Sequence, residues 1–310
     1  MKKEEGKHIK FDSISEAHRA FGLPKPRHPL ISLVGSHDPG LADIKGPSGS
    51  HVLNFYKISY RPKLSGKLKY GQHYYDFDEG GLLFASPNQL IGKGNEDDSP
   101  AGECSLYTLL IHPDFLLGYP LSKAIRQYGF FSYSVNEALH LSETEKATVM
   151  AIFGMMREEL NSRIDDFSQD VVVSQIELLL NYANRFYQRQ FITRKAVNSG
   201  VLQRLDDLLG EYFDRDLCLS QGLPTVAYLA SQVNLSPSYL SDMLRSLIGQ
   251  NAQQYIHIRL IEKAKEKLST TSLTVSEVAY ALGFEHSQSF CKLFKTKTTL
   301  SPSEFRRRFN

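Results

Sequence analysis

The stretch TVAYLASQVNLSPSYLSDML, residues 225–244, recurs in altered form as TVSEVAYALGFEHSQSFCKLF, residues 274–294. Equivalent positions lie 49 residues apart up to Asn234 and Gly283, and 50 residues apart after the additional Glu285. The correspondence continues as far as Tyr255 and Phe305. Apolar positions and turn residues that stay in register over about thirty residues indicate an internal repeat.

Each copy has the pattern of a helix, a tight turn and a second helix. The first helix carries apolar residues at the i, i+3, i+4, i+7 spacing of one buried face, namely Val226, Leu229, Ala230 and Val233. Asn234 and Gly283 occupy the same turn position, and both residue types tolerate a positive φ. Ser236 and Pro237 suit the N-cap and the first position of the next helix. The pattern predicts two helix-turn-helix units, a motif whose second helix enters the DNA major groove.

The second helix of each unit is expected to bury one face and expose the other. The residues expected inside are Leu240, Met243, Leu244 and Leu247 in the first unit and Phe290, Leu293 and Phe294 in the second. Those expected outside are Ser238, Ser241, Asp242 and Arg245 in the first unit and Ser287, Gln288, Cys291, Lys292 and Lys295 in the second.

The C-terminal part of the chain resembles the AraC/XylS-type transcription regulators. The matching stretches are SPSYLSDMLRSLIG (236–249), IRLIEKAKEKL (258–268), VSEVAYALGFEHSQSFCKLFK (275–295) and SPSEFRRRF (301–309). One departure is Thr299, where the family usually has the glycine that Gly249 supplies in the first unit. This departure puts in doubt the shape of the turn before the last helix. The alternative interpretation of the repeat is a helical bundle that binds protein instead of DNA.

The resemblance implies which side chains face the bases. These positions fall on Ser238, Ser241 and Asp242 in the first unit and on Ser287, Gln288 and Lys292 in the second. Glutamine pairs with adenine and lysine donates to guanine, whereas aspartate only accepts, as from cytosine N4. The chemistry therefore favours the second set. The expected phosphate contacts are Arg245, Lys295, Lys297, Arg306, Arg307 and Arg308.

Charge is distributed unevenly along the 310 residues. From Leu223 onward the chain has eleven Lys and Arg against six Asp and Glu, which gives +5. The remainder has 25 against 28, which gives −3 within an overall charge of +2. A basic C-terminal module on a mildly acidic body is typical of DNA binding.

Composition argues against several other classes of protein. The cysteines Cys104, Cys218 and Cys291 are dispersed, so neither a disulfide framework nor a zinc site is expected. The N-terminal MKKEEGKHIKF lacks the apolar segment of a signal peptide, and no apolar run approaches bilayer length. We expect a cytoplasmic protein without cofactor, metal or membrane contact.

The N-terminal half has the signals of a small β-barrel. A polar lead-in spans residues 1–27, and residues 28–140 contain short aromatic and β-branched runs separated by Gly, Pro and Asn. The runs are His51–Tyr60, Leu68–Tyr75, Leu82–Ala85 and Ser105–His112. Such spacing suggests a barrel or jelly roll. YGQHYYDFDEGGLLFASPNQ, residues 70–89, is similar to the middle of the cupin-like sensing domain that the family often carries.

An enzyme is not expected in this barrel. His51, His73 and His112 are isolated and form no His-x-His pair, and the chain has no triad or nucleotide-binding loop. Tyrosine offers both an apolar face and a hydroxyl, so the aromatic residues could line a pocket for a small effector. The pocket candidates are Tyr56, Tyr70, His73 and Tyr75, although ordinary core packing explains each of them as well.

Residues 141–199 return to a helical period. Ser142 and Glu145 form a capping-box pattern, and two amphipathic helices follow. Their apolar faces could cover the barrel, pair with a second subunit, or do both. We expect a homodimer, with Ile176 and Leu180 on its helices. Residues 200–310 then form the DNA-binding domain.

Together these patterns predict an α+β chain: a cupin-like jelly roll with a helical segment, followed by an all-α domain of two helix-turn-helix units. The expected function is that of a DNA-binding transcription regulator controlled by a small effector. Its partners would be double-stranded DNA and a second copy, with RNA polymerase a candidate. The alternative is the same DNA reader with an N-terminal domain that serves only for dimerisation or for binding a partner protein.

Overall fold

A computed structural model describes residues 9–35, 51–62, 68–70, 73–75, 80–91, 107–134, 137–162 and 168–308. For residues 68–70, 73–75 and 195–197 it describes the backbone alone. The chain divides into two compact units, Met1–Gln190 and Phe191–Asn310. In the described ranges no helix is long and apolar enough to cross a membrane.

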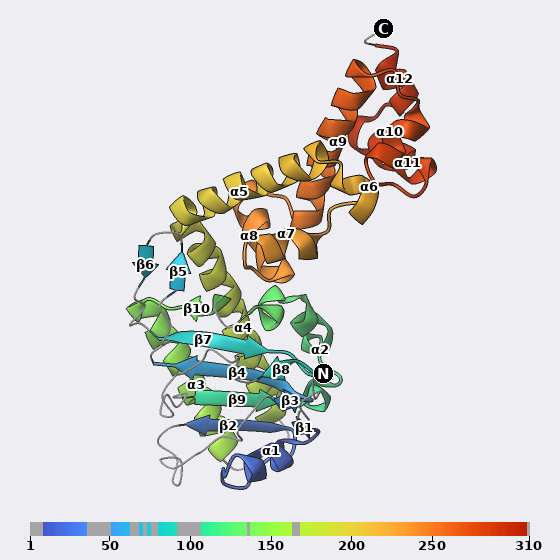
Figure 1. Ribbon diagram of the computed structural model, residues 1–310. Coiled ribbons are helices and arrows are strands. Elements are labelled where there is room, and N and C mark those ends of the chain that lie inside the picture. Colours follow the sequence, from blue (N-terminus) through green and yellow to red (C-terminus); the bar gives the residue numbers. More distant parts are fainter. Residues whose placement is uncertain are drawn as a thin grey trace, which may run out of the picture. The chain divides into compact units, whose positions relative to one another are not determined.

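The described residues of the N-terminal unit form three sheets (Figure 1). The largest has the antiparallel order β10 (Leu139–His140), β7 (Gly81–Ala85), β4 (Tyr56–Arg61), β9 (Tyr107–Ile111) and β2 (Ile31–Gly35). The second contains β1 (Ile9–Phe11), β3 (His51–Leu53) and β8 (Leu90–Ile91), and the third pairs β5 (Leu68–Tyr70) with β6 (His73–Tyr75). The α+β class is confirmed. The described strands form separate sheets rather than one closed barrel, so the cupin-like jelly roll stays a prediction.

Strand alternation gives the five-stranded sheet two different faces. Ile58 and Tyr60 of β4 are fully buried on one face, where Tyr107 of β9 stacks on Phe153 of α3 with ring centroids 5.2 Å apart. Helices α3 (Glu143–Asn161) and α4 (Ser168–Thr193) lie behind this sheet in Figure 1. This face is therefore the main apolar core of the unit.

The other face carries a smaller core. Leu110 of β9 packs with Phe11 of β1, Leu53 and Phe55 around β3, and Ile14 of α1 (Ile14–Ala20). Short helical turns connect β9 to β10: η1 (Pro113–Leu116), α2 (Leu121–Ala124), η2 (Ile125–Gln127) and η3 (Gly129–Ser132).

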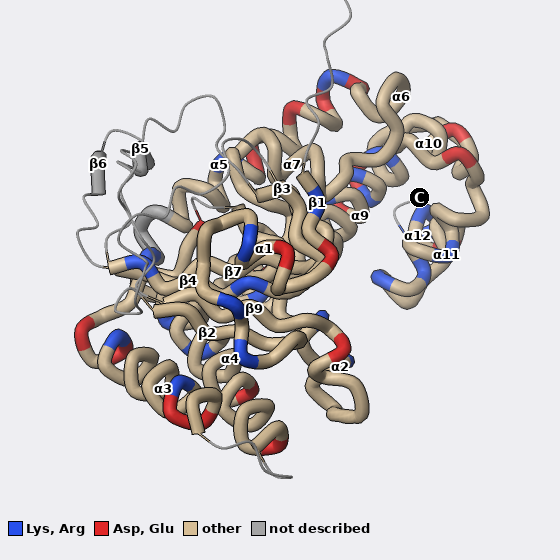
Figure 2. Tube along the Cα trace, turned by 90° about the horizontal axis from the view of Figure 1, so that it is seen from below, with Lys and Arg blue, Asp and Glu red and all other residues tan. Residues whose placement is uncertain are grey.

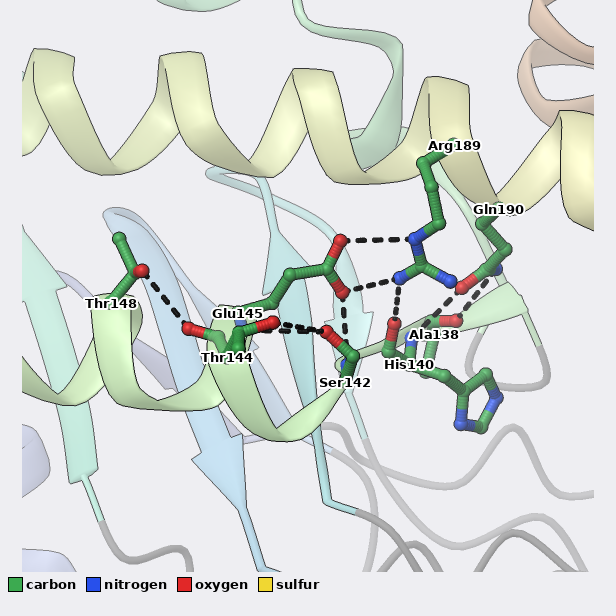
Figure 3. Close-up of polar contacts among 8 residues, drawn as sticks. All are labelled: Ala138, His140, Ser142, Thr144, Glu145, Thr148, Arg189 and Gln190. Carbon is green, nitrogen blue, oxygen red and sulfur yellow. Dashed lines mark hydrogen bonds and ion pairs between the residues drawn. The ribbon is translucent and has the colours of Figure 1, made fainter.

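A polar cluster joins the start of α3 to the last turns of α4 (Figure 3). Ser142 and Glu145 form the predicted capping box, with the Ser142 N–H donating to Glu145 Oε2 at 2.9 Å. The Arg189 guanidinium donates to both carboxylate oxygens of Glu145, at 2.6 and 3.0 Å, and to the His140 carbonyl at 2.7 Å. The side-chain oxygen of Gln190 accepts from the His140 N–H at 2.9 Å. Such two-pronged, charge-assisted bonds fix both helices against β10.

The prediction that Ile176 and Leu180 face a second subunit is wrong for these two side chains. Both are 0% exposed within a single chain. The apolar stripe of α4 is consumed by the unit's own core, because the helix covers the sheet.

The C-terminal unit contains eight helices within its described residues (Figure 1). They are α5 (Lys195–Asp214), α6 (Leu217–Gln221), α7 (Val226–Gln232), α8 (Pro237–Ile248), α9 (Ala252–Thr270), α10 (Val275–Ala281), α11 (Ser287–Thr298) and α12 (Pro302–Arg306). The sequence repeat becomes two three-helix units, α7–α8–α9 and α10–α11–α12. Helix α9 contacts α7 and α8 as well as α10, α11 and α12. It therefore forms the shared centre of the domain.

Candidate nucleic-acid interface

The two predicted turns have the same backbone geometry. Asn234 and Gly283 have φ values of +55° and +88°. The Leu235 N–H donates to the Ala230 carbonyl at 2.9 Å, and the equivalent bond between Phe284 and Ala279 measures 3.0 Å. This six-residue closure is a helix C-cap in which a left-handed residue ends the helix. The repeat in the sequence is thus a repeat of structure.

Besides its positive φ, a second feature requires glycine at position 283. An added Cβ would lie 2.8 Å from the Gly222 carbonyl carbon and 3.0 Å from the Cys218 oxygen. The segment after α6 therefore packs directly on the second turn.

Thr299 ends α11 with φ +65°, close to the +72° of Gly249 at the end of α8. The turn before the last helix, whose shape the sequence left in doubt, consequently has the same left-handed conformation as its counterpart in the first unit. A threonine in this region is strained, since its branched side chain crowds the backbone.

Helix α8 presents a narrow polar face. The Ser236 hydroxyl accepts from the Tyr239 N–H at 3.2 Å, which confirms it as the N-cap. Ser238 and Ser241 are partly buried. Asp242 accepts from Arg245 at 2.6 Å, and the Arg245 side chain is 58% exposed. The first unit therefore offers two short hydroxyls and one internally neutralised ion pair.

Helix α11 presents a broader and more cationic face. Phe290 and Phe294 are 0% exposed and anchor the helix through their ring contacts. Gln288, Lys292 and Lys295 are exposed at i, i+4 and i+7, so they form one outward stripe. Ser287 is partly buried and Lys297 is exposed. The exposed Ser289, which sequence reasoning missed, lies one turn before Lys292 and could have been found from its i, i+3 spacing.

The C-terminal arginines do not act alike. Arg306 is partly buried and donates to the Leu268 carbonyl at 3.2 Å, near the end of α9. Arg307 and Arg308 are exposed. Arg306 Nε thus caps the end of α9, and the phosphate contacts of Arg306, Arg307 and Arg308 stay predictions.

Two cations of α9 are neutralised within the domain. Arg259 forms ion pairs with Asp206 and Glu262 at 2.6 and 2.8 Å, and Lys263 pairs with Asp214 at 3.0 Å. Lys292, Lys295 and Lys297 of α11 and Arg307 and Arg308 just after α12 are exposed and take part in none of these ion pairs, and Figure 2 shows Lys and Arg along α11 and near α12.

The predicted effector residues belong to the N-terminal unit. The Tyr56 ring packs on Phe131 with centroids 5.1 Å apart, on the helix-covered face of the sheet. Tyr70, His73 and Tyr75 lie in β5 and β6, and their side chains fall outside the described residues. In the described ranges no three His, Cys, Asp or Glu side chains are grouped to hold a metal ion. The pocket assignment stays a prediction.

Comparison with known proteins is limited to the C-terminal part of the chain. A protein family described as "Helix-turn-helix domain" matches residues 229–308. The HTH-type transcriptional regulator YijO of Escherichia coli is 33% identical over 108 residues, which cover 35% of this chain and 37% of the relative. A regulator of the same description from Staphylococcus aureus (strain MSSA476) is 27% identical over 138 residues, or 44% of this chain and 17% of the relative. The matches therefore span well under half the length of these relatives.

Among solved structures, the C-terminal domain of the two-component response regulator yesN from Fusobacterium nucleatum is similar to this chain. It is 32% identical, and the alignment covers 33% of this chain and 96% of that domain with a TM-score of 0.28.

Proposed function

Because its C-terminal part is a helix-turn-helix domain of the AraC/XylS type, we propose that the protein is a sequence-specific DNA-binding transcription regulator. The observation that carries this proposal is the outward stripe Gln288, Lys292 and Lys295 on the second helix of a helix-turn-helix unit. A bundle that only binds protein has no need of an uncompensated cationic stripe beside an amide. Two such units in one domain suit two successive major grooves, about 34 Å apart.

In this proposal α11 supplies most of the base reading. The Gln288 amide pairs with adenine N6 and N7, and Lys292 donates to guanine O6 and N7 or to a phosphate. Helix α8 reads less, since its serines are short and partly buried. Asp242 holds Arg245 in place at 2.6 Å, so Arg245 points a fixed guanidinium towards the backbone or a base. Lys295, Lys297, Arg307 and Arg308 supply phosphate contacts.

Selection of bound DNA from a random pool tests the proposal. A regulator of this kind should enrich a site with two short conserved blocks about one helical turn apart. The block facing α11 should be the more constrained one. Failure to enrich any sequence, with the chain folded, would refute sequence-specific binding and favour the protein-binding bundle.

We predict that Gln288→Ala and Lys292→Ala each weaken binding to the selected site by about 1–3 kcal/mol. Each removes donors aimed at a base edge, and neither side chain is buried. Titration of labelled DNA at fixed salt measures the change. Lys123→Ala, an exposed lysine of the N-terminal unit, removes the same charge and should leave affinity unchanged. If Gln288→Ala and Lys292→Ala bind as tightly as the parent, these residues do not read bases.

For the N-terminal unit we propose control of DNA binding by a small effector, with dimerisation through the surface of α3 and α4. The alternative is a unit that only dimerises or binds a partner protein. An effector must change DNA affinity, and DNA must change effector affinity by the same factor. DNA titrations with and without the bound ligand distinguish an effector-binding unit from one that only dimerises or binds a partner protein. Sedimentation of the full chain shows whether it forms a dimer.

A further inference from the structure

Helix α9 carries a stripe of polar side chains that is bonded to α5. Tyr255, Arg259 and Lys263 are spaced at i, i+4 and i+8, which places them on one side of α9. The Tyr255 hydroxyl donates to Asp206 of α5, and the Arg259 guanidinium pairs with the same carboxylate at 2.6 Å. About two turns further along α5, Asp214 accepts from the Lys263 ammonium group at 3.0 Å. These five residues form the α5–α9 cluster, which joins the two helices at two levels.

Contacts within α9 hold the Arg259 side chain of this cluster in place. Arg259 also pairs with Glu262 at 2.8 Å, and its guanidinium lies over the Tyr255 ring, 5.5 Å from the centroid. Burial, together with the bond to Asp206, raises the pKa of the Tyr255 hydroxyl to about 12, so this group keeps its proton and stays a donor. An isolated surface ion pair contributes little, whereas pairs that share partners in a network contribute more.

The α5–α9 cluster lies on the helix that both repeat units share. Helix α9 contacts α8 as well as α11, and Leu260 and Ala264 of α9 are fully buried. Apolar burial is non-directional, whereas the cluster pairs defined atoms and so favours one orientation of α9 over others nearby. The orientation of α9 in turn sets the distance and the angle between α8 and α11, because both helices pack on it.

We propose that Asp206 and Asp214 are positioning residues for DNA reading. Through Arg259 and Lys263 they hold α9 in the orientation that sets the separation of α8 and α11, and with it the spacing of the DNA site that the domain accepts. The inference rests on the proposed function, since it takes α8 and α11 as the two reading helices. It goes beyond that function by assigning the choice of spacing to side chains of α5, outside both repeat units.

Two DNA sites that differ only in spacing test the proposal with the full chain. The first is the site that the parent selects, and the second has one base pair inserted between its two blocks, which moves them apart by about 3.4 Å. Asp206→Asn removes the carboxylate charge, while the amide oxygen can still accept from the Tyr255 hydroxyl. The parent should prefer the selected site. In Asp206→Asn the ratio of the two affinities should fall roughly 3–10-fold, a coupling expected within one ion-pair network.

A merely structural role predicts a different outcome. Loss of stability alone would lower the affinity for both sites by the same factor and leave their ratio unchanged, which would overturn the proposal. Asp207→Asn is the matched control, because Asp207 is exposed on α5 and accepts from Gln203 of the same helix at 3.0 Å. It removes the same charge and should leave the ratio unchanged. An equal fall in Asp207→Asn and Asp206→Asn would show a general charge effect and would also overturn the proposal.

A double-mutant cycle shows whether Asp206 acts through Arg259. If it does, Arg259→Gln should lower the ratio as Asp206→Asn does, and the double variant should lower it no further than either single variant. Additive falls would contradict the proposal. Asp214→Asn should lower the ratio less than Asp206→Asn, since the Asp214 side chain is 68% exposed. This milder variant serves if Asp206→Asn fails to fold, which thermal unfolding of the full chain reveals.

Selection by the parent keeps the two proposals distinguishable. If the parent enriches a site with two blocks and Asp206→Asn keeps the parent's ratio, the proposed function stands and this inference fails. If the parent enriches no sequence, the proposed function fails and this inference fails with it.

Discussion

The Ile176→Asp variant should unfold the N-terminal unit. Ile176 is 0% exposed in the core between α4 and the five-stranded sheet. Losing a buried isoleucine typically costs about 2–5 kcal/mol, and burying an unpaired carboxylate adds to that loss. The sum exceeds roughly 4 kcal/mol, a large part of the 5–15 kcal/mol that stabilises a typical domain. Urea denaturation of the full chain measures the loss.

A matched control lies on the same helix. Leu178 is 41% exposed, so Leu178→Asp should change the free energy of unfolding by less than about 1 kcal/mol. If Ile176→Asp instead yields a folded monomer from a dimeric parent, the side chain faces a second subunit after all.

The second large effect is expected for Gly283→Ala. A Cβ at φ +88° is strained, and here it also meets the Gly222 backbone at 2.8 Å. We expect a loss of about 2–4 kcal/mol from the C-terminal unit, because backbone atoms must shift to admit the methyl group. Gly249→Ala separates the two causes. Gly249 has φ +72° with open space around it, so its loss should be only about 1 kcal/mol. Equal losses in denaturation would show that the close approach to Gly222 costs nothing.

The C-terminal unit could be predicted closely, because its signals are local. The turn residues Asn234 and Gly283 and the cap Ser236 each act within a few residues, and all three have the expected geometry. Arg306 could not be predicted, since its partner is the Leu268 carbonyl on a different helix. A run of three arginines indicates positive charge but not which one turns inward.

The N-terminal unit was predicted only in outline. The stripe containing Ile176 showed that one face of α4 is buried, but a stripe does not say whether its own sheet or a second subunit covers it. Likewise, alternation in β4 separates Tyr56 from Lys57, yet it does not tell which face meets the helices. The aromatic residues drew attention as pocket candidates, whereas Tyr56 packs on Phe131. Long-range packing decides which surface covers each of these faces, and it cannot be predicted from the local pattern of a single sequence.

Helix α9 contacts every other helix of both repeat units. Under the proposed function, this makes the domain a bivalent ligand for DNA. Once α11 is seated, α8 meets the adjacent groove as an intramolecular event, at an effective concentration that tethering raises to about the millimolar range. Helix α8, whose short serines bind DNA too weakly to hold it alone, then adds to the avidity of the whole domain for DNA. Weak contacts by the first unit would thus slow dissociation, and sequence variation in their half of the site would show mainly in the residence time on DNA.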